Sequence, residues 1–363
     1  MMPRSQTKRE RHSQRLGPSS IVWIQTSFLG DLVLTTGALK LVRRAWPQTK
    51  QLLVTTPTGE KLLKGHSAID KIITMEKSGF GLRAFFDVVE ECRDYVIDRE
   101  SSVTLLPHRS FRSALLAQRI GLPTVGYRES DFPWLLSHAV DRISIFHETI
   151  RIGLLLEPLG ISRQEITAIR PALEHRLGDD DAWMKEQKDY PKVKRWVAIA
   201  PGSVWGTKRW PATHFAWLMN LLFDSYSDVG FVLLGSKSEI RASNEVIAAL
   251  SEPGPVVNLV GRTNFSQMSQ VIARMSLLVA NDSAPVHFAS AWNTPTVEIF
   301  GATTSSMGFG PLADHSAVCE IELDCRPCSD HGPKVCPLGH FHCMKGLSPT
   351  DVFWACRRVL GAN

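Results

Sequence analysis

The stretch from Trp196 to Pro211 reads WVAIAPGSVWGTKRWP and contains the clearest fold signal in the chain. It begins with the apolar run VAIA at 197–200, in which no polar residue alternates with the apolar ones. Such a run is typical of a strand that is covered on both faces, as strands of parallel sheets are. Pro201 and Gly202 end the strand, and Pro211 suits the first turn of a following helix. This order of strand, loop and helix predicts a βαβ unit.

The same alternation continues in both directions from this stretch. In the second half we predict strands at 196–200, 230–234, 256–260, 277–280 and 297–300, with helices near 212–225, 237–250, 265–275 and 284–293. In the first half we predict strands at 21–24, 52–55, 71–73 and 95–98, with helices near 31–46, 58–64, 80–92 and 110–120. Strands that alternate with helices of about 10–15 residues predict an α/β fold with parallel sheets.

The length and composition of the chain favour two globular domains. The chain has 363 residues, of which 44% are hydrophobic and 21% are charged, which excludes a wholly disordered protein. The charged, proline-containing stretch at 174–195 interrupts the alternation. We therefore predict two Rossmann-like domains, a linker between them and a C-terminal helix that could pack on either domain. The predicted bounds are 21–175 and 196–348 for the domains, 176–195 for the linker and 349–363 for the helix.

The positive charge of the chain is concentrated at its N-terminus. Residues 1–20 carry +4 of the net charge of +5, so the rest of the chain is nearly neutral. A folded part without excess positive charge gives no support for nucleic-acid binding. We predict that residues 1–20 form a disordered leader, and the alternative is a basic arm drawn to anionic lipid. The sequence has no apolar run that approaches the length of a membrane-spanning helix.

The loop after the first predicted strand reads QTSFLGD at 25–31. Ligands of doubly wound folds bind at the carboxyl ends of the strands, which is where this loop lies. Asp31 could face a ligand there, or it could be an acid that stabilises the N-terminus of the next helix. The loop lacks the G-x-G-x-x-G pattern, so a dinucleotide-binding dehydrogenase is disfavoured.

Two loops of the second half also follow predicted strands and suit a phosphorylated ligand. In the loop at 201–211, the hydroxyl of Ser203 and the charge of Lys208 could hold a diphosphate, unless the loop is merely solvated. The loop at 281–287 reads NDSAPVH. Its Asp282 and Ser283 offer capping oxygens at a helix N-terminus, which is a geometry that also binds phosphate or ribose.

Two further groups of residues have open interpretations. Arg109 and Arg112 suit an acidic acceptor because guanidinium matches carboxylate and phosphate, although both could be ordinary surface charge of a helix. Four cysteines follow the spacing C-x2-C-x7-C-x6-C, namely Cys325, Cys328, Cys336 and Cys343. This spacing lacks a second C-x2-C pair, so reduced thiols or a disulfide are favoured over a structural zinc site.

Together these motifs resemble glycosyltransferase family 9, the bacterial lipopolysaccharide heptosyltransferases, and most closely its heptosyltransferase II members. The resemblance extends from Ile21 to Leu360. It rests on the order and spacing of TSFLGD at 26–31, RSFRSA at 109–114, PGS at 201–203, KRWP at 208–211, NDSAPVH at 281–287 and CPLGH at 336–340. One departure is Ala284, which stands where the family usually has glycine and would be strained if that position needs a positive φ.

The resemblance implies a GT-B fold, in which two Rossmann-like doubly wound domains face a central cleft. It implies an inverting, metal-independent transfer of L-glycero-D-manno-heptose from ADP-heptose to heptosyl-Kdo2-lipid A, in the inner core of lipopolysaccharide. The enzyme would need no cofactor and no nucleic-acid partner. It would be a cytoplasmic protein of Gram-negative bacteria, peripheral at the inner membrane.

The resemblance also assigns expected roles to individual residues. Asp31 is expected to be the general base, and Lys208 to stabilise the departing ADP. The expected donor-binding residues are Ser203, Lys208, Asp282, Ser283, Ala284, Pro285 and His287, and the expected acceptor-binding residues are Gly30, Arg109 and Arg112, with no metal ligand. Two alternatives remain open: a family 9 transferase with another nucleotide sugar or acceptor, and a non-catalytic nucleotide-binding protein that retains the fold.

Overall fold

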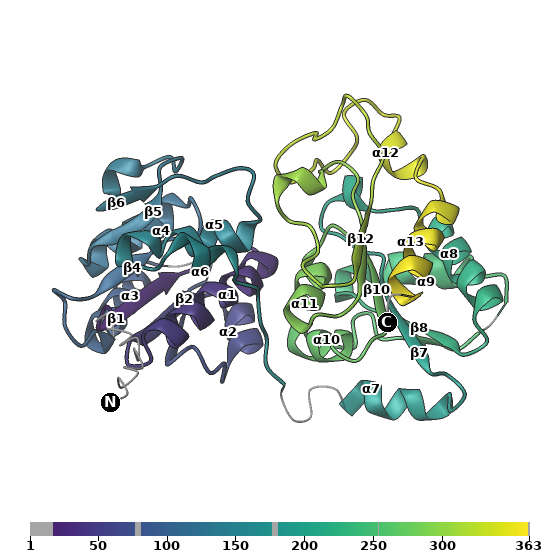
Figure 1. The fold of residues 1–363 in the computed structure, drawn as a ribbon, viewed down its shortest axis with the longest axis horizontal. Coiled ribbons are helices and arrows are strands. Elements are labelled where there is room, and N and C mark those ends of the chain that lie inside the picture. The colour runs from purple at the N-terminus through teal and green to yellow at the C-terminus, as the bar shows by residue number, and fades with distance from the viewer. Residues whose placement is uncertain (1–16, 77–80, 176–180, 253, 362–363) are drawn as a thin grey trace, which may run out of the picture.

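The computed structural model describes residues 17–76, 81–175, 181–252 and 254–361. Of the predicted leader and linker, residues 1–16 and 176–180 lie outside the described residues. The described chain forms two lobes, each built on a six-stranded sheet with helices on both faces (Figure 1). Among these residues, no helix has both the length and the apolar character that crossing a membrane requires.

The sheet of the first lobe has the strand order β3-β2-β1-β4-β5-β6, and all its strands are parallel. Its strands are β1 (Ser20–Ile24), β2 (Lys50–Thr55), β3 (Lys71–Thr74), β4 (Val103–Leu105), β5 (Thr124–Tyr127) and β6 (His138–Val140). Trp23 packs on the face that is covered by α1 (Leu29–Ala45), α5 (Glu148–Leu154) and α6 (Arg163–Thr167). The neighbouring Val22 packs on the opposite face, against α3 (Leu82–Tyr95) and α4 (Phe111–Ile120).

The sheet of the second lobe has the order β12-β11-β10-β7-β8-β9, which repeats the order of the first sheet. Its strands are β7 (Arg195–Ala200), β8 (Val229–Leu233), β9 (Val256–Asn258), β10 (Leu277–Asn281), β11 (Thr296–Ile299) and β12 (Ser316–Cys319). The helices that cover its two faces are α8 (Ala212–Ser225) with α13 (Pro349–Gly361), and α10 (Phe265–Ile272) with α11 (Ala284–Trp292). The C-terminal helix α13 thus packs on the second lobe, against α8 and β12.

The described second half of the chain contains three further α-helices. α7 (Asp181–Glu186) precedes β7, α9 (Ile240–Ala248) follows β8, and α12 (His342–Lys345) precedes α13. Trp183 of α7 is buried and meets Trp196 of β7 edge to face, with the ring centroids 4.7 Å apart. Side chains of the stretch that was predicted as a linker therefore pack against the sheet of the second lobe.

The structure confirms the predicted α/β fold with two doubly wound parallel sheets, but it corrects one strand. The predicted strand at 95–98 does not exist, because α3 continues through Tyr95 and the strand beside β1 is Val103–Leu105. The side chain of Ile97 is 66% exposed, whereas Val103 and Leu105 are buried. A central parallel strand is covered on both faces, so a segment with an exposed isoleucine does not suit that place. The structure also contains three short strands that the sequence did not predict, β5, β6 and β12.

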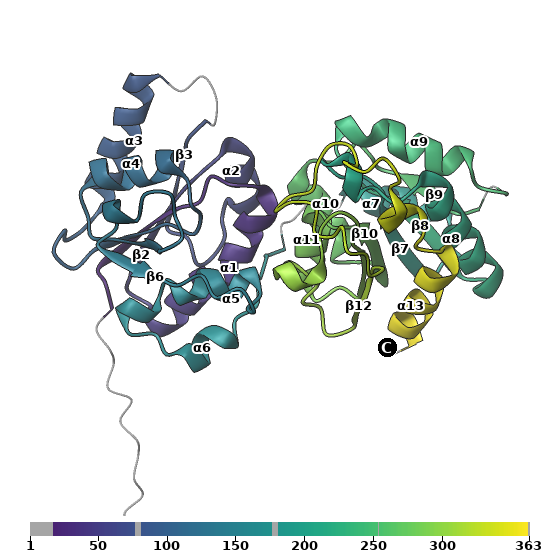
Figure 2. The same ribbon diagram turned by 90° about the horizontal axis from the view of Figure 1, so that it is seen from above.

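The two lobes meet along their helices. α1 packs against α11, and α2 (Pro57–Leu63) packs against α10 (Figure 2). Hydrogen bonds from α5 to the loop after β11 join the lobes at a second place. The Glu148 N–H donates to the carbonyl of Gly308 at 2.8 Å, and a guanidinium N–H of Arg151 donates to the carbonyl of Met307 at 2.9 Å. These contacts hold the start of α1 opposite the loops of the second sheet.

Candidate active site

A cavity of about 540 Å³ lies between the two lobes. The first lobe contributes the start of α1, from Phe28 to Asp31, and the second lobe contributes loops that follow its strands. Strands of a parallel sheet all end at one edge, so these loops converge on the cavity. The predicted site residues that line it are Gly30, Asp31, Ser203, Lys208, Asp282, Ser283, Ala284, Pro285 and His287.

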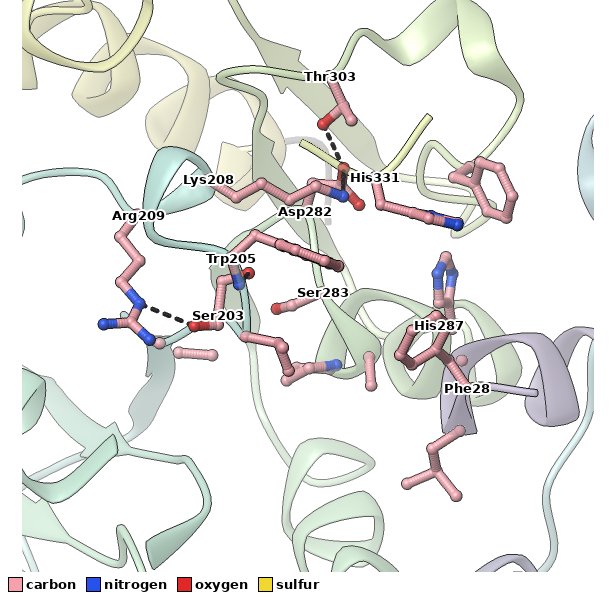
Figure 3. Close-up of a pocket in the computed structure, with 18 of the residues that line it drawn as sticks. Phe28, Ser203, Trp205, Lys208, Arg209, Asp282, Ser283, His287, Thr303 and His331 are labelled. Carbon is pink, nitrogen blue, oxygen red and sulfur yellow. Dashed lines mark hydrogen bonds and ion pairs between the residues drawn. The ribbon is translucent and has the colours of Figure 1, made fainter. Parts of the chain in front are cut away.

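Lys208 and Asp282 form a buried ion pair in the wall of this cavity. The Lys208 Nζ lies 2.6 Å from the Asp282 Oδ2, and the Thr303 hydroxyl donates to the same oxygen at 2.5 Å (Figure 3). Together with Thr303, the pair joins loops that follow three strands, β7, β10 and β11. A lysine ammonium has three donors, and one of them is directed at Asp282. The ammonium is thereby fixed in place as a positive charge at the edge of the cavity.

The buried side chain of Asn281 explains why the loops at 201–211 and 281–287 lie together. Its amide nitrogen donates to the carbonyl of Pro201 at 2.8 Å, and its amide oxygen accepts from the Trp210 N–H at 3.1 Å. Asn281 ends β10, so one residue holds the loop after β7 against the start of α11. Ser283 at the N-cap of α11 and Ser203 in the other loop both line the cavity (Figure 3). Ala284 begins α11 without the positive φ that would have strained it.

Asp31 reaches the cavity from the first turn of α1. Burial in the cavity wall raises the pKa of its carboxyl group above the ordinary value, and the negative charge of Glu148 adds to this effect. A hydrogen bond from Ser27 and the charge of His331 act in the opposite direction. A carboxylate with a raised pKa is a stronger base than an ordinary one, which suits proton abstraction.

His287 lies between the lobes. Its ring touches Gly30 so closely that a Cβ on Gly30 would lie 2.5 Å from the His287 Cδ2. Burial lowers the pKa of His287 to about 4, with further lowering by His147 and Lys208, so the imidazole is neutral at pH 7. Among the described residues, its buried Nδ1 has no hydrogen-bond partner. Glycine at position 30 therefore allows the start of α1 to approach α11.

Trp205, Glu239 and His331 are among the residues that line the cavity but were not predicted as site residues. The His331 ring lies parallel to the Trp205 ring with centroids 6.3 Å apart, and edge-on to Phe28 at 5.7 Å. His331 thus touches both lobes. Sequence spacing does not relate positions 28, 205 and 331. The one available signal is that His331 lies within the cysteine-rich segment 325–343.

Glu239 stands at the start of α9, after β8. Its carboxylate accepts hydrogen bonds from the N–H and the hydroxyl of Ser236, at 2.6 and 2.8 Å. A Cβ on Gly202 would lie 2.0 Å from the Glu239 Oε1, which explains the glycine at that position. The pattern Ser236-x-x-Glu239 after a predicted strand is a capping signal that could have identified this residue.

Arg109 and Arg112 do not line the central cavity. The guanidinium of Arg112 donates to the carbonyl of Glu76 at 2.7 Å, and Arg109 is exposed at the end of β4. A second cavity of about 380 Å³ lies between Glu76 and the start of α1, and it is lined in part by Phe28. The two arginines therefore follow β4 on the same edge of the first sheet as Asp31, and Arg112 contacts Glu76 in the wall of this second cavity.

The structure records all seven cysteines as unpaired thiols. In the cysteine-rich segment, the Cys325 Sγ and the His340 Nε2 are 4.0 Å apart. Within the described ranges, no three His, Cys, Asp or Glu side chains form a group that could hold a metal ion.

Known proteins with similar sequences point to one family. Residues 102–338 match the model of glycosyltransferase family 9 (heptosyltransferase). The chain is 28% identical over 319 residues to lipopolysaccharide heptosyltransferase 2 of Escherichia coli K12, covering 82% of this chain and 86% of that relative. It is 32% identical over 169 residues to lipooligosaccharide heptosyltransferase 2 of Campylobacter jejuni serotype O:2, covering 46% of this chain. The chain spans about half the length of that relative, 51%.

Solved structures support the fold. A glycosyl transferase family 9 structure from Veillonella parvula has a TM-score of 0.83 at 20% identity, covering 96% of this chain and 99% of that one. The E. coli ADP-heptose lps heptosyltransferase II structure has a TM-score of 0.76 at 23% identity, covering 94% and 99%. These likenesses confirm the predicted GT-B arrangement of two Rossmann-like lobes.

Proposed function

Because the chain belongs to glycosyltransferase family 9, we propose that it transfers L-glycero-D-manno-heptose from ADP-heptose to heptosyl-Kdo2-lipid A. One observation carries this proposal. A half-buried carboxylate of one lobe, Asp31, shares a cavity with the Lys208–Asp282 pair and the α11 N-terminus of the other lobe. A base on one side and fixed positive charge on the other are what transfer from a nucleoside diphosphate sugar needs.

In this proposal Asp31 is the general base. The acceptor hydroxyl gives its proton to the Asp31 carboxylate while its oxygen bonds to the anomeric carbon of the heptose. The bond from that carbon to the diphosphate breaks on the opposite face, so the configuration inverts. The raised pKa of Asp31 and its position at the cavity wall support this role.

Lys208 and the start of α11 serve the leaving group. When the glycosidic bond breaks, negative charge develops on the terminal phosphate of ADP. The ammonium of Lys208, the hydroxyl of Ser203 and the helix N-terminus at Ser283 and Ala284 would stabilise this charge. The hydrogen bonds of Asp282 hold the ammonium in place before the reaction begins. The transfer therefore requires no metal ion in this proposal.

The rest of the cavity suits the nucleoside. Glu239 follows β8, and a carboxylate at the end of a strand in such a fold is placed to bind ribose hydroxyls. Leu234, Phe265 and Met268 form apolar walls nearby, which suit a flat purine ring. Pro285 and the neutral ring of His287 complete the wall on the side of the first lobe, next to Gly30.

The acceptor determines where the protein works. Heptosyl-Kdo2-lipid A is anchored in a bilayer by its acyl chains, so the enzyme would act as a peripheral protein at the cytoplasmic face of the inner membrane of a Gram-negative bacterium. Arg109 and Arg112 remain candidates for the acidic groups of this acceptor, because they lie on the same sheet edge as Asp31.

The test measures transfer from ADP-heptose to heptosyl-Kdo2-lipid A, with a chelator present, for the wild type and Asp31→Asn. We expect turnover by the wild type and a loss of about 100-fold or more in the variant. Asp224→Asn, which changes an exposed carboxylate on α8, is the control and should retain full activity. Equal turnover by both Asp31 forms would remove Asp31 from the mechanism. ADP binding without any transfer by the wild type would favour another sugar or acceptor, and then a non-catalytic protein.

A further inference from the structure

Three aromatic side chains form an exposed patch on the first lobe. The rings of Phe111 and Phe132 have centroids 4.4 Å apart, and those of Phe132 and Trp134 are 5.4 Å apart. Phe111 is 50% exposed and Trp134 is 73% exposed. We call Phe111, Phe132 and Trp134 the aromatic ridge. Large apolar side chains that touch one another at the surface, instead of the core, mark an interaction site.

The ridge lies on the edge of the sheet that carries the candidate base. Phe111 follows β4, and Trp134 lies in a short 3₁₀ helix, Pro133–Leu135, between β5 and β6. Two other exposed apolar residues also follow strands of this sheet, Phe28 after β1 and Leu82 after β3, with exposed fractions of 50% and 81%. Since the carboxyl ends of parallel strands share one edge, these apolar side chains and Asp31 lie on the same edge.

The second cavity connects this edge to the active site. Phe28 lines both the central cavity and the second one, whose wall also contains the hydroxyl-bearing residues Thr56 and Thr58. At its far side is Glu76, whose carbonyl accepts a hydrogen bond from Arg112, the neighbour of Phe111. An acceptor with its reacting hydroxyl at Asp31 could therefore extend through a hydroxyl-lined cavity toward the ridge.

The charges around the ridge nearly cancel. Arg109 and Arg112 flank Phe111, while Glu129 and Asp131 precede Phe132. The carboxylate of Glu129 accepts hydrogen bonds from the Arg142 N–H at 3.1 Å. A patch of this composition would bind a partner through its rings more than through net charge. Tryptophan and phenylalanine beside arginine are typical of residues that sit at the membrane–water interface.

We propose that the aromatic ridge inserts into the surface of the bilayer that carries the acceptor and thereby directs the cleft toward the acceptor sugar. This inference rests on the proposed function, because that function makes the acceptor a lipid. A bilayer fits better than a protein partner, because the hydrogen bond from Arg112 to Glu76 links the patch to the cavity through which a lipid-anchored acceptor would reach Asp31. Insertion of rings also predicts binding that survives high salt, unlike attraction of the basic leader to anionic lipid.

The first experiment measures binding of the full chain to vesicles of phosphatidylethanolamine and phosphatidylglycerol, by flotation in 0.1 and 0.5 M salt. We expect Phe111→Ser with Trp134→Ser to reduce the partition coefficient at least tenfold at both salt concentrations. The matched control is Trp217→Ser, which removes a ring that is 56% exposed on α8 of the second lobe and should change binding less than twofold. An equal ADP-induced shift in Tm shows that each variant is folded.

The second experiment compares transfer to the acceptor embedded in vesicles with transfer to a deacylated, water-soluble acceptor. We expect the double variant to lose at least tenfold in kcat/KM with the embedded acceptor and less than twofold with the soluble one. Equal losses with both acceptors would overturn the proposal and place the ridge in the sugar site. Unchanged flotation of the double variant would also overturn the proposal. If the wild type is a dimer and the double variant is a monomer, the ridge is instead a contact between two copies of the chain. Ridge-dependent flotation without heptose transfer would contradict only the proposed function.

Discussion

At the residue scale, the neighbours Gly30 and Asp31 are subject to different constraints, which are steric at Gly30 and electrostatic at Asp31. Gly30 is small because the ring of His287 occupies the place of a Cβ. Asp31 is ionisable in a place that disfavours its charge, since burial and Glu148 both raise its pKa. A group that is unfavourable for folding and lies in a cavity is a sign of function, because stability alone would select against it.

The raised pKa of Asp31 predicts that the carboxylate destabilises the folded protein at neutral pH. An acid whose pKa is higher in the folded than in the unfolded state lowers stability as pH rises above the unfolded value, about 4. Asp31→Asn should therefore raise the free energy of unfolding by about 1 kcal/mol at pH 7.5, and by less as pH falls toward 5. Urea denaturation at both pH values measures this difference. A variant that is less stable than the wild type at pH 7.5 would contradict the expectation.

At the element scale, the segment after β12 lines the central cavity although it has almost no regular structure. The side chain of Arg326 is 3% exposed and holds this segment in place. Its guanidinium donates to the carboxylate of Glu320 at 2.8 Å and to the carbonyl of Thr303 at 2.7 Å. Thr303 in turn holds Asp282, so one arginine supports both the loop after β11 and the segment that carries His331.

We predict that Arg326→Ala lowers the free energy of unfolding by about 3 kcal/mol, because it leaves buried acceptors without their donor. ADP affinity should fall as well, since Asp282 loses the support of Thr303. The matched control is Arg241→Ala, whose side chain is 92% exposed in a pair with Glu245 and should change stability by less than about 0.5 kcal/mol. Denaturation and ADP titration of both variants check this. Equal stability of the two variants would show that the hydrogen bonds of Arg326 do not stabilise the fold.

At the scale of the whole molecule, the lobes share one apolar core. Buried residues of α1 and of α10 and α11 belong to the same cluster, so the contact between the lobes is not only polar. Residues such as Val33 and Val286 are fully buried within it. Separation of the lobes would expose this surface to water, which opposes their independent unfolding.

We therefore predict that the described lobes unfold in one cooperative transition. ADP at about 100 times its Kd should raise the free energy of that whole transition by about 2.7 kcal/mol, although its proposed contacts lie mainly in the second lobe. Calorimetry with and without ADP measures both quantities. Two separated transitions, of which only one responds to ADP, would show that the lobes are independent.

Local patterns in the sequence are sufficient to predict the class of the fold and the position of the loops that line the cavity. Non-alternating apolar strands and the helices between them are local signals, so the two parallel sheets and the loops at 25–31, 201–211 and 281–287 could be predicted. Where the local signal is weak, the predicted strand was wrong, as at 95–98, or no strand was predicted, as for β5, β6 and β12. The strand at Val103–Leu105 has three residues, and its place beside β1 depends on burial rather than on a sequence period.

Which residues share the cavity depends on contacts between elements that are distant in the sequence. His331 lies beside Trp205 and meets Phe28 of the other lobe because the helices of the two lobes pack together. Sequence spacing contains no information on that contact. Packing of α5 on α1 within the first lobe brings the charge of Glu148 near Asp31, and the raised pKa of Asp31 could not be derived from residue type. Arg109 and Arg112 were expected at the acceptor, and the structure places them beyond the central cavity. Local patterns determine elements, whereas distances between elements depend on packing across the whole chain.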